Sequence, residues 1–229
     1  MTDRRKPSWR EGLDVAASSI LLVAASVVLW KAWPRASEPR EVPKLPIEFA
    51  GDQIKGDLQA RIGMVQYSDF QCPFCGQFAR ETLPLLDQQY IQPGQLRFAF
   101  RHLPIERIHP LAKGAAQAAE CAGRQGLFWQ AHDAFFVQAA KLDRGSLLAS
   151  MEEMGADMGR WKECVDSPQT GEVLAAHLTE ARTLRISGTP YFLIGTVEGN
   201  RLRVRSVVSG AVSFARLKAD VDSALASVR

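Results

Sequence analysis

Apolar and polar positions divide the chain into three stretches. An apolar run without a charged residue covers residues 15–30 and follows a basic segment, residues 4–10. Residues 34–46 contain four prolines and several charges, a composition typical of a stiff, extended spacer. From residue 47 onward, short apolar runs alternate with segments of helical periodicity, so we expect one folded body at residues 47–229.

The first stretch predicts a transmembrane anchor. Residues 13–33 reach the ~20 positions that a span needs, with Trp30 and Trp33 suited to the membrane interface. The basic flank predicts that residues 1–12 stay cytoplasmic and that the remainder lies outside the cytoplasmic membrane, where disulfides form. A cleaved signal peptide is an alternative, although no A-x-A-like site follows the run, and a buried core helix is another.

The folded body begins with a strand–helix–strand pattern. Residues 61–70 are strand-like, residues 74–90 carry apolar positions at helical spacing, and residues 96–103 predict a second strand. Pro84 is expected to kink or split the intervening helix. This order predicts a βαβ unit.

The remainder predicts a helical block and then a return to the sheet. Residues 109–186 lack strand character and predict helices at 109–122, 127–140, 145–154, 157–166 and 170–186. Residues 191–194 predict a short strand, residues 201–208 an edge strand, and residues 213–228 an amphipathic helix capped by Ser213. We therefore expect an α/β sheet with an all-helical insertion at about residues 109–186.

Composition excludes some classes of function. The net charge of +3 is small and the basic residues are scattered, so nucleic acid is not an expected partner. The four histidines are dispersed with no i, i+4 pair, so we expect neither a metal site nor a cofactor. Trp129 and His132, one helical turn apart, are expected to pack the helical block.

Cys72 and Cys75 form a C-x-x-C pair where a predicted strand passes into a predicted helix. Beside a βαβ unit, this spacing indicates thiol–disulfide chemistry. Cys72 falls at the N-cap, where free backbone N–H groups and the helix dipole stabilise a thiolate. Cys75, one turn later, is placed to close a disulfide with Cys72. A zinc half-site and an inert structural disulfide are the alternatives.

Gly188-Thr189-Pro190 precedes the strand at residues 191–194. By itself this sequence predicts only a turn. Together with an upstream C-x-x-C it favours a cis proline opposite the cysteines, whose preceding backbone is left able to bind a peptide. An ordinary trans turn is the alternative.

These residues resemble the thioredoxin superfamily, specifically its DsbA-like oxidoreductases with a helical insertion. The resemblance covers about residues 47–229 and rests on DFQCPFC at 69–75, QGLFW at 125–129 with His132-Asp133, and GTP at 188–190. It implies a thioredoxin-like fold in which Cys72 is the exposed, attacking cysteine and Cys75 resolves the mixed disulfide. It also implies that the substrate contacts Thr189 and Pro190, and we expect the same of Pro73 and Phe74.

The resemblance also implies partners. The substrates would be cysteine-containing exported proteins, and a quinone-linked membrane oxidase would reoxidise the pair. Many relatives carry a buried acid six residues before the first cysteine, whereas this chain has Gln66, which cannot titrate. Asp69 should face away from Gln66 by strand alternation. Either Asp69 substitutes through a water molecule, or the proton of Cys75 passes directly to solvent.

Cys121 and Cys164 lie in two predicted helices of the insertion. In an oxidising compartment they predict a structural disulfide. Buried free thiols and an auxiliary redox pair are the alternatives.

Three functions remain after the sequence analysis. The first is a monomeric disulfide oxidase, and the second is an isomerase or reductase that uses the same site. The third is a non-enzymatic anchored thiol protein that binds copper or a partner. Isomerases of the superfamily commonly carry an N-terminal dimerisation domain, and the short segment between Trp33 and the first strand at residue 61 favours the oxidase.

Overall fold

The computed structural model describes residues 42–43, 46–49 and 53–228. The predicted cytoplasmic segment (1–12), the anchor (13–33) and most of the predicted linker lie outside these residues, so their boundaries stay predictions. No helix in the described ranges is both long and apolar enough to cross a membrane.

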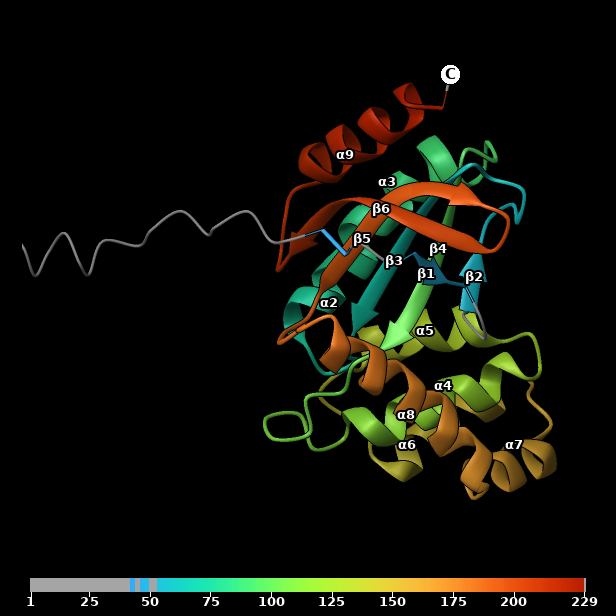
Figure 1. Cartoon of the computed structure of the whole chain (residues 1–229). Helices are drawn as coiled ribbons and strands as arrows, with labels where there is room; N and C mark the ends of the chain where they lie inside the picture. The colour runs from blue at the N-terminus through green and yellow to red at the C-terminus, as the bar shows by residue number, and fades with distance from the viewer. Residues whose placement is uncertain (1–41, 44–45, 50–52, 229) are drawn as a thin grey trace, which may run out of the picture. The chain divides into compact units, whose positions relative to one another are not determined.

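A six-stranded sheet forms the centre of the body, in the order β1-β6-β5-β3-β4-β2 (Figure 1). β3 and β4 run parallel, and each other neighbouring pair is antiparallel. The strands are β1 (Ile47–Glu48), β2 (Gln53–Lys55), β3 (Ile62–Ser68), β4 (Leu96–His102), β5 (Tyr191–Glu198) and β6 (Arg201–Ser209). The predicted βαβ unit is therefore confirmed.

The prediction that residues 201–208 form an edge strand is wrong. β6 is not at the edge, because β1 pairs with it through Ile47 and Leu202. A two-residue strand is too short to show alternation, so the sequence pattern did not reveal β1. β6 also bulges against β5, where a Cβ at Gly195 would lie only 1.9 Å from the Arg203 carbonyl oxygen, so the close approach requires glycine.

The helix between β3 and β4 alternates between α-helical and π-helical winding. It runs through α2 (Pro73–Gln77), the π-helical turn η1 (Phe78–Thr82), α3 (Leu83–Leu86) and a second π-helical turn, η2 (Asp87–Ile91). Pro84 has no N–H to donate into the preceding turn, and the wider turn η1 comes directly before α3. The expected irregularity at Pro84 is confirmed.

Five helices lie between β4 and β5, close to the predicted positions. They are α4 (Ala112–Gly123), α5 (Phe128–Val137), α6 (Arg144–Glu153), α7 (Met158–Val165) and α8 (Pro168–Thr183). Asp143, Asp157 and Ser167 cap α6, α7 and α8 with their side chains, which satisfies backbone N–H groups that the first helical turn leaves free. The last helix, α9 (Phe214–Ala226), begins after Ser213, whose hydroxyl accepts from the N–H of Arg216 as predicted.

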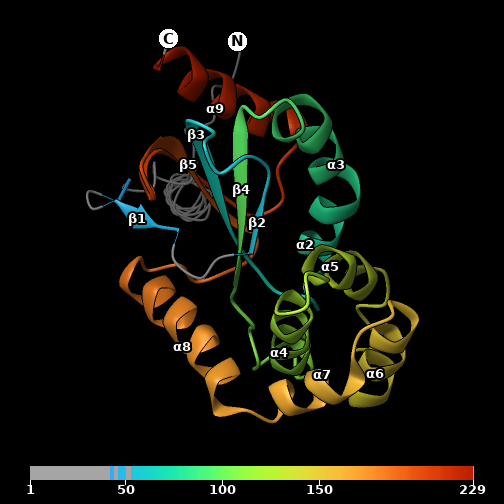
Figure 2. The ribbon, with the colours of Figure 1, turned by 90° about the vertical axis from the view of Figure 1, so that its right-hand side faces the viewer.

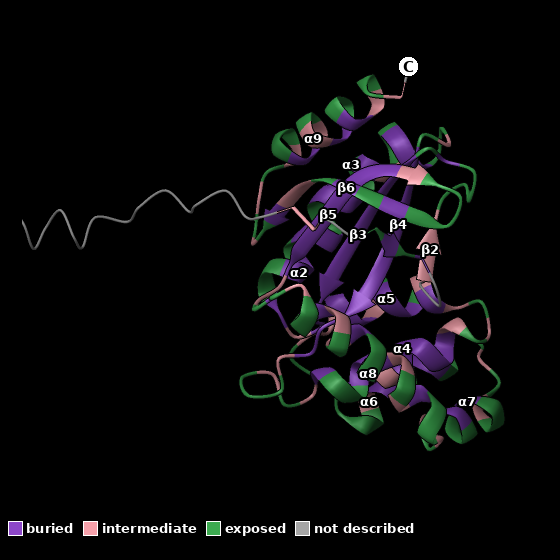
Figure 3. Ribbon diagram, in the orientation of Figure 1, coloured by how far each residue is buried: buried purple, intermediate pink, exposed green. Residues whose placement is uncertain are grey.

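Three apolar clusters hold these elements together. One face of the sheet packs on α3 and α9, and the other face packs on α8 and the segment around β1 (Figure 2). The third cluster joins the carboxyl ends of β3 and β4 to the helical block and contains both Cys72 and Cys75. Figure 3 shows the central strands buried, with exposed residues on the outer sides of α6, α7 and α9. The cysteine pair therefore lies where the sheet meets the insertion.

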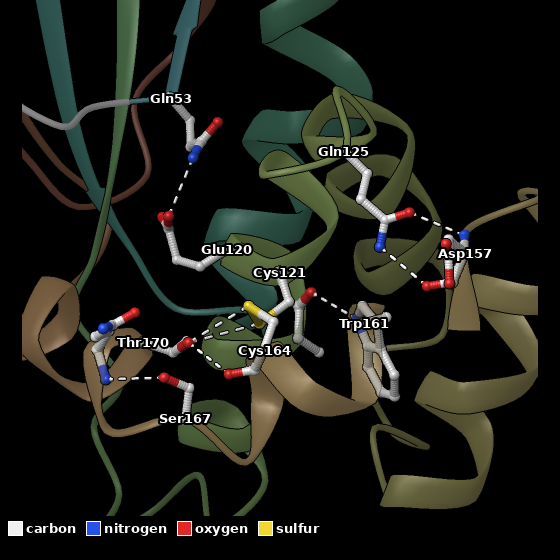
Figure 4. Close-up of a disulfide and its surroundings, with 11 residues drawn as sticks. Gln53, Glu120, Cys121, Gln125, Asp157, Trp161, Cys164, Ser167 and Thr170 are labelled. Carbon is white, nitrogen blue, oxygen red and sulfur yellow. Dashed lines mark hydrogen bonds between the residues drawn. A yellow bond between two sulfur atoms is a disulfide. The ribbon is translucent and has the colours of Figure 1, made fainter. Parts of the chain in front are cut away.

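A disulfide joins Cys121 in α4 to Cys164 in α7 (Figure 4). Their Cα atoms are 5.7 Å apart, within the expected reach. The Thr170 hydroxyl at the start of α8 lies 3.6 Å and 3.5 Å from the two sulfurs and donates to the Cys164 carbonyl oxygen at 2.8 Å. The predicted pairing is present, and it ties together three helices of the insertion.

Candidate active site

The two cysteines lie at the turn from β3 into α2. Cys72 has extended backbone angles and is the N-cap of α2, and its N–H donates to the Asp69 carbonyl oxygen at 3.0 Å. Pro73 is the first residue of the helix, a position whose N–H has no acceptor within the helix, so proline costs no hydrogen bond there. Local sequence thus places Cys72 at the helix start and Cys75 one turn later.

The structure corrects the expected exposure of Cys72. Both cysteines are unpaired thiols, and Cys72 is only 5% exposed while Cys75 is 0% exposed. The side chain that projects into solvent is Phe74, at 54% exposed. Cys72 is buried because the third apolar cluster and the loop before β5 cover it. A substrate sulfur must therefore approach through a narrow opening.

The Cys72 thiol has a pKa lowered to about 6. The main cause is the hydrogen bond from the Cys75 thiol, and the Thr189 side chain and the backbone N–H groups of Cys75 and Phe74 at the helix start add to it. Burial acts in the opposite direction and does not cancel these interactions. Cys72 is accordingly a thiolate at neutral pH, which is the nucleophilic form.

The pKa of the Cys75 thiol is raised well above its usual value. Burial is the main cause, and the neighbouring Cys72 sulfur raises it further. Hydrogen bonds from the Ser68 side chain and from the Asp69 backbone act in the opposite direction. The pair therefore consists of one thiol that ionises readily and one buried thiol whose ionisation is opposed.

The Asp69 carboxylate has partners other than Cys75. One oxygen of its carboxylate accepts from the Gln71 N–H, and the other accepts from the Ile105 N–H, each at 2.8 Å. The second oxygen also lies 2.8 Å from Nδ1 of His109. The carboxylate thus holds the loop after β4. Gln66 is 0% exposed.

The loop before β5 covers the sulfur of Cys72. The Thr189–Pro190 peptide bond is cis, as predicted. The Thr189 carbonyl oxygen lies 3.5 Å from Cys72 Sγ, although 117 positions separate the two residues in the sequence. Thr189 and Pro190, two of the expected substrate contacts, are therefore beside the attacking cysteine.

A groove of about 490 Å³ runs from this loop along the helix that carries the cysteines. Its aromatic and proline wall consists of Phe74, Phe78, Pro190, Phe192 and Phe214. Pro73 is exposed at the start of α2 but does not line the groove. The groove offers an apolar surface next to the reactive sulfur.

Sequence reasoning missed two parts of this site. Ser68 is two positions after Gln66, so strand alternation places both on one face of the sheet. The sequence pattern does not show that this face is near Cys75. Val212, in the connection between β6 and α9, and Phe214, the first residue of α9, also line the groove, and no local signal relates them to the C-x-x-C.

Trp129 and His132 pack in the interior. Trp129 Nε1 donates to the Ile54 carbonyl oxygen at 3.2 Å, and the His132 ring lies 5.2 Å from the Trp129 ring. Burial lowers the pKa of His132, so the ring is neutral in its aromatic surroundings. In the described ranges, no three His, Cys, Asp or Glu side chains come together in a metal-binding group.

Alkylation of the reduced protein should follow the titration of Cys72. Its rate is expected to be half-maximal near pH 6 and to fall about tenfold per unit below that pH, because the thiolate is lost as pH drops through the pKa. Cys75 should remain unlabelled until strongly alkaline pH. Mass spectrometry of iodoacetamide-treated protein measures both rates. The Cys75→Ala variant, which lacks the hydrogen-bond donor, should show a higher Cys72 pKa. Faster labelling of Cys75 would reverse the two roles.

Comparisons with known proteins agree with this geometry. The sequence model of the thioredoxin family matches residues 50–208. Among curated proteins, the Na(+)/H(+) antiporter NhaA 1 of Salinispora arenicola is 32% identical over 185 residues. That match includes 81% of this chain but only 26% of the antiporter, so the chain spans about a quarter of this relative's length.

Solved structures share the fold. Alpha-DsbA1 of Wolbachia pipientis superposes with a TM-score of 0.70 at 20% identity, over 80% of this chain and 94% of that one. Oxidised BdbD of Bacillus subtilis superposes with a TM-score of 0.68 at 17% identity, over 81% of this chain and 99% of that one. The chain therefore belongs to the thioredoxin family and has the fold of its DsbA-like thiol–disulfide oxidoreductases.

Proposed function

We propose that this protein is a monomeric disulfide oxidase that introduces disulfides into exported proteins through Cys72 and Cys75. The observation that carries the proposal is the Cys72 pKa of about 6 beside a buried Cys75. A stabilised thiolate favours the reduced pair, which makes the disulfide form a stronger oxidant. A thiol of low pKa is also a good leaving group, so Cys72 is readily released from a mixed disulfide.

The reaction is a pair of exchanges. A substrate thiolate attacks Cys72 Sγ of the disulfide form, the Cys72–Cys75 bond breaks, and Cys75 leaves as a thiolate that takes up a proton. A second substrate thiolate then attacks the substrate sulfur of the mixed disulfide and releases the Cys72 thiolate. The substrate gains a disulfide and the protein keeps two electrons, which a quinone-linked membrane oxidase would remove.

The groove beside the cis proline supports a polypeptide substrate. An extended segment that lies along it would contact Phe74, which is exposed, and Pro190. The Thr189 N–H makes no hydrogen bond within the described part of the chain and is available to a bound backbone. Apolar contacts and backbone hydrogen bonds can bind polypeptides of many different sequences. Such binding suits substrates that share only the presence of cysteines.

We also propose that the body is anchored on the outer side of the cytoplasmic membrane by residues 13–33. The apolar run and its basic flank support this location.

Complementation in a bacterium that lacks its own exported-protein disulfide oxidase tests the proposal. The full chain should fractionate with membranes and restore disulfides in an exported reporter, whereas the Cys72→Ser variant should not. The purified couple should have a reduction potential above that of glutathione. A potential near that of thioredoxin would indicate a reductase instead. A soluble mature form that starts after Trp33 would show that residues 13–33 are a signal peptide.

A further inference from the structure

One face of the helix that follows the cysteine pair lines the groove beside the cis proline. Phe74, Gln77, Glu81 and Leu85 lie three or four positions apart between the start of α2 and α3, and all four line the groove. Phe74 is 54% exposed and Leu85 is 39% exposed. This face therefore presents apolar side chains to solvent, with a carboxylate between them.

Glu81 is the charged side chain of the groove, because every other lining residue is apolar or carries an uncharged polar group. Oε2 of its carboxylate accepts a hydrogen bond from the Gln77 amide at 3.0 Å. In the described part of the chain, no Lys, Arg or His side chain pairs with Glu81. A carboxylate beside an apolar wall attracts a cation more strongly than one surrounded by water, since the effective dielectric constant is lower there.

Cations close to the groove in sequence have other partners. Arg80, the neighbour of Glu81, donates to the Phe136 carbonyl oxygen at 3.1 Å and lines a separate cavity. Arg216, two positions after Phe214 of the groove wall, pairs with Asp220 at 2.9 Å. The negative charge of Glu81 is therefore available to a bound molecule.

The distance of Glu81 from the reactive cysteine determines where a substrate charge would lie. Glu81 comes nine positions after Cys72, which corresponds to about 13 Å along a helix. An extended polypeptide covers that length in about four residues. A substrate segment that lies along the groove with its cysteine at Cys72 thus brings the fourth residue from that cysteine to Glu81.

We propose that Glu81 is a specificity-determining residue, which selects substrates with a lysine or arginine about four residues from the reactive cysteine and apolar residues between the two. The apolar residues pack on the aromatic wall of the groove, and the basic side chain forms an ion pair with the Glu81 carboxylate. Glu81 takes no part in the disulfide exchange itself. This inference rests on the proposed function.

Peptide kinetics with the oxidised full chain test the inference. Synthetic peptides with a single cysteine carry lysine, norleucine or glutamate at the fourth residue from it, on either side. Acid quenching and mass spectrometry give the rate of mixed-disulfide formation at Cys72. On one side of the cysteine, the lysine peptide should react about two- to fivefold faster than the norleucine peptide, the range expected for an exposed ion pair. The difference should disappear in 1 M salt, which screens exposed charges.

Variants at position 81 separate its charge from the intrinsic reactivity of each peptide. Glu81→Gln keeps the size of the side chain without the charge, so lysine and norleucine peptides should react equally fast. Glu81→Lys should reverse the preference in favour of the glutamate peptide. Glu163→Gln removes an exposed carboxylate of α7, outside the groove, and should keep the lysine preference.

Equal rates for lysine and norleucine peptides in the wild-type chain would overturn the inference. A lysine preference that persists in Glu81→Gln and Glu81→Lys would also overturn it. Failure of the oxidised wild-type chain to react with any of the peptides would instead contradict the proposed function.

Discussion

Gln66→Glu is expected to speed closure of the Cys72–Cys75 disulfide and release of a linked peptide by about 10²–10⁴-fold, the usual range for general-base help. The new carboxylate would stand where the Gln66 amide lies 3.4 Å from Ser68 Oγ. We expect this carboxylate to take up the proton that the Cys75 thiol loses, which the amide of Gln66 cannot do. The gain should be most visible below pH 7, where an unaided Cys75 remains a thiol. Stopped-flow kinetics on a Cys72-linked peptide measure it.

Controls for Gln66→Glu follow from the same geometry. Gln66→Met keeps a side chain of similar size without a base, so this variant should show no gain. The free energy of unfolding should decrease, since position 66 is fully buried and a carboxylate there lacks a charged partner. An unchanged rate in Gln66→Glu, with a large loss in Asp69→Asn, would mean that Asp69 already supplies the base.

Loss of the Cys121–Cys164 disulfide is expected to lower the free energy of unfolding by roughly 4 kcal/mol. The two cysteines are separated by 43 positions in the sequence. A disulfide across such a loop lowers the conformational entropy of the unfolded chain, and the chain-entropy relation gives roughly 4 kcal/mol for this effect. The double variant Cys121→Ala/Cys164→Ala, unfolded in urea beside the wild type under oxidising conditions, measures the difference. Alanine suits both positions because both lie in the apolar cluster of the insertion.

Alkylation of Cys72 in the same double variant is the control. Its pH dependence should be unchanged below the unfolding transition, since neither Cys121 nor Cys164 contributes to the lowered pKa of Cys72. A loss of less than about 1 kcal/mol would contradict a structural role for the disulfide. A change in the Cys72–Cys75 potential on its removal would support the alternative of an auxiliary redox pair.

The sequence alone determined the features that depend on near neighbours in the chain. Apolar spacing placed the five helices α4–α8 to within a few residues, because helical periodicity and side-chain caps act over one or two turns. Cys72, Pro73 and Cys75 specified a helix start with a thiol at its N-cap for the same reason. The lowered pKa of Cys72 follows partly from that position, since helix N–H groups contribute to it.

Tertiary structure decided the features that join distant segments. The two-residue strand β1 exists only because β6 offers it a partner, and the burial of Cys72 depends on Thr189, 117 positions away. The contact of the Asp69 carboxylate with His109 likewise joins residues that are 40 positions apart in the sequence. Such contacts depend on how strands and helices pack, and packing is set by the whole set of buried side chains rather than by local pattern.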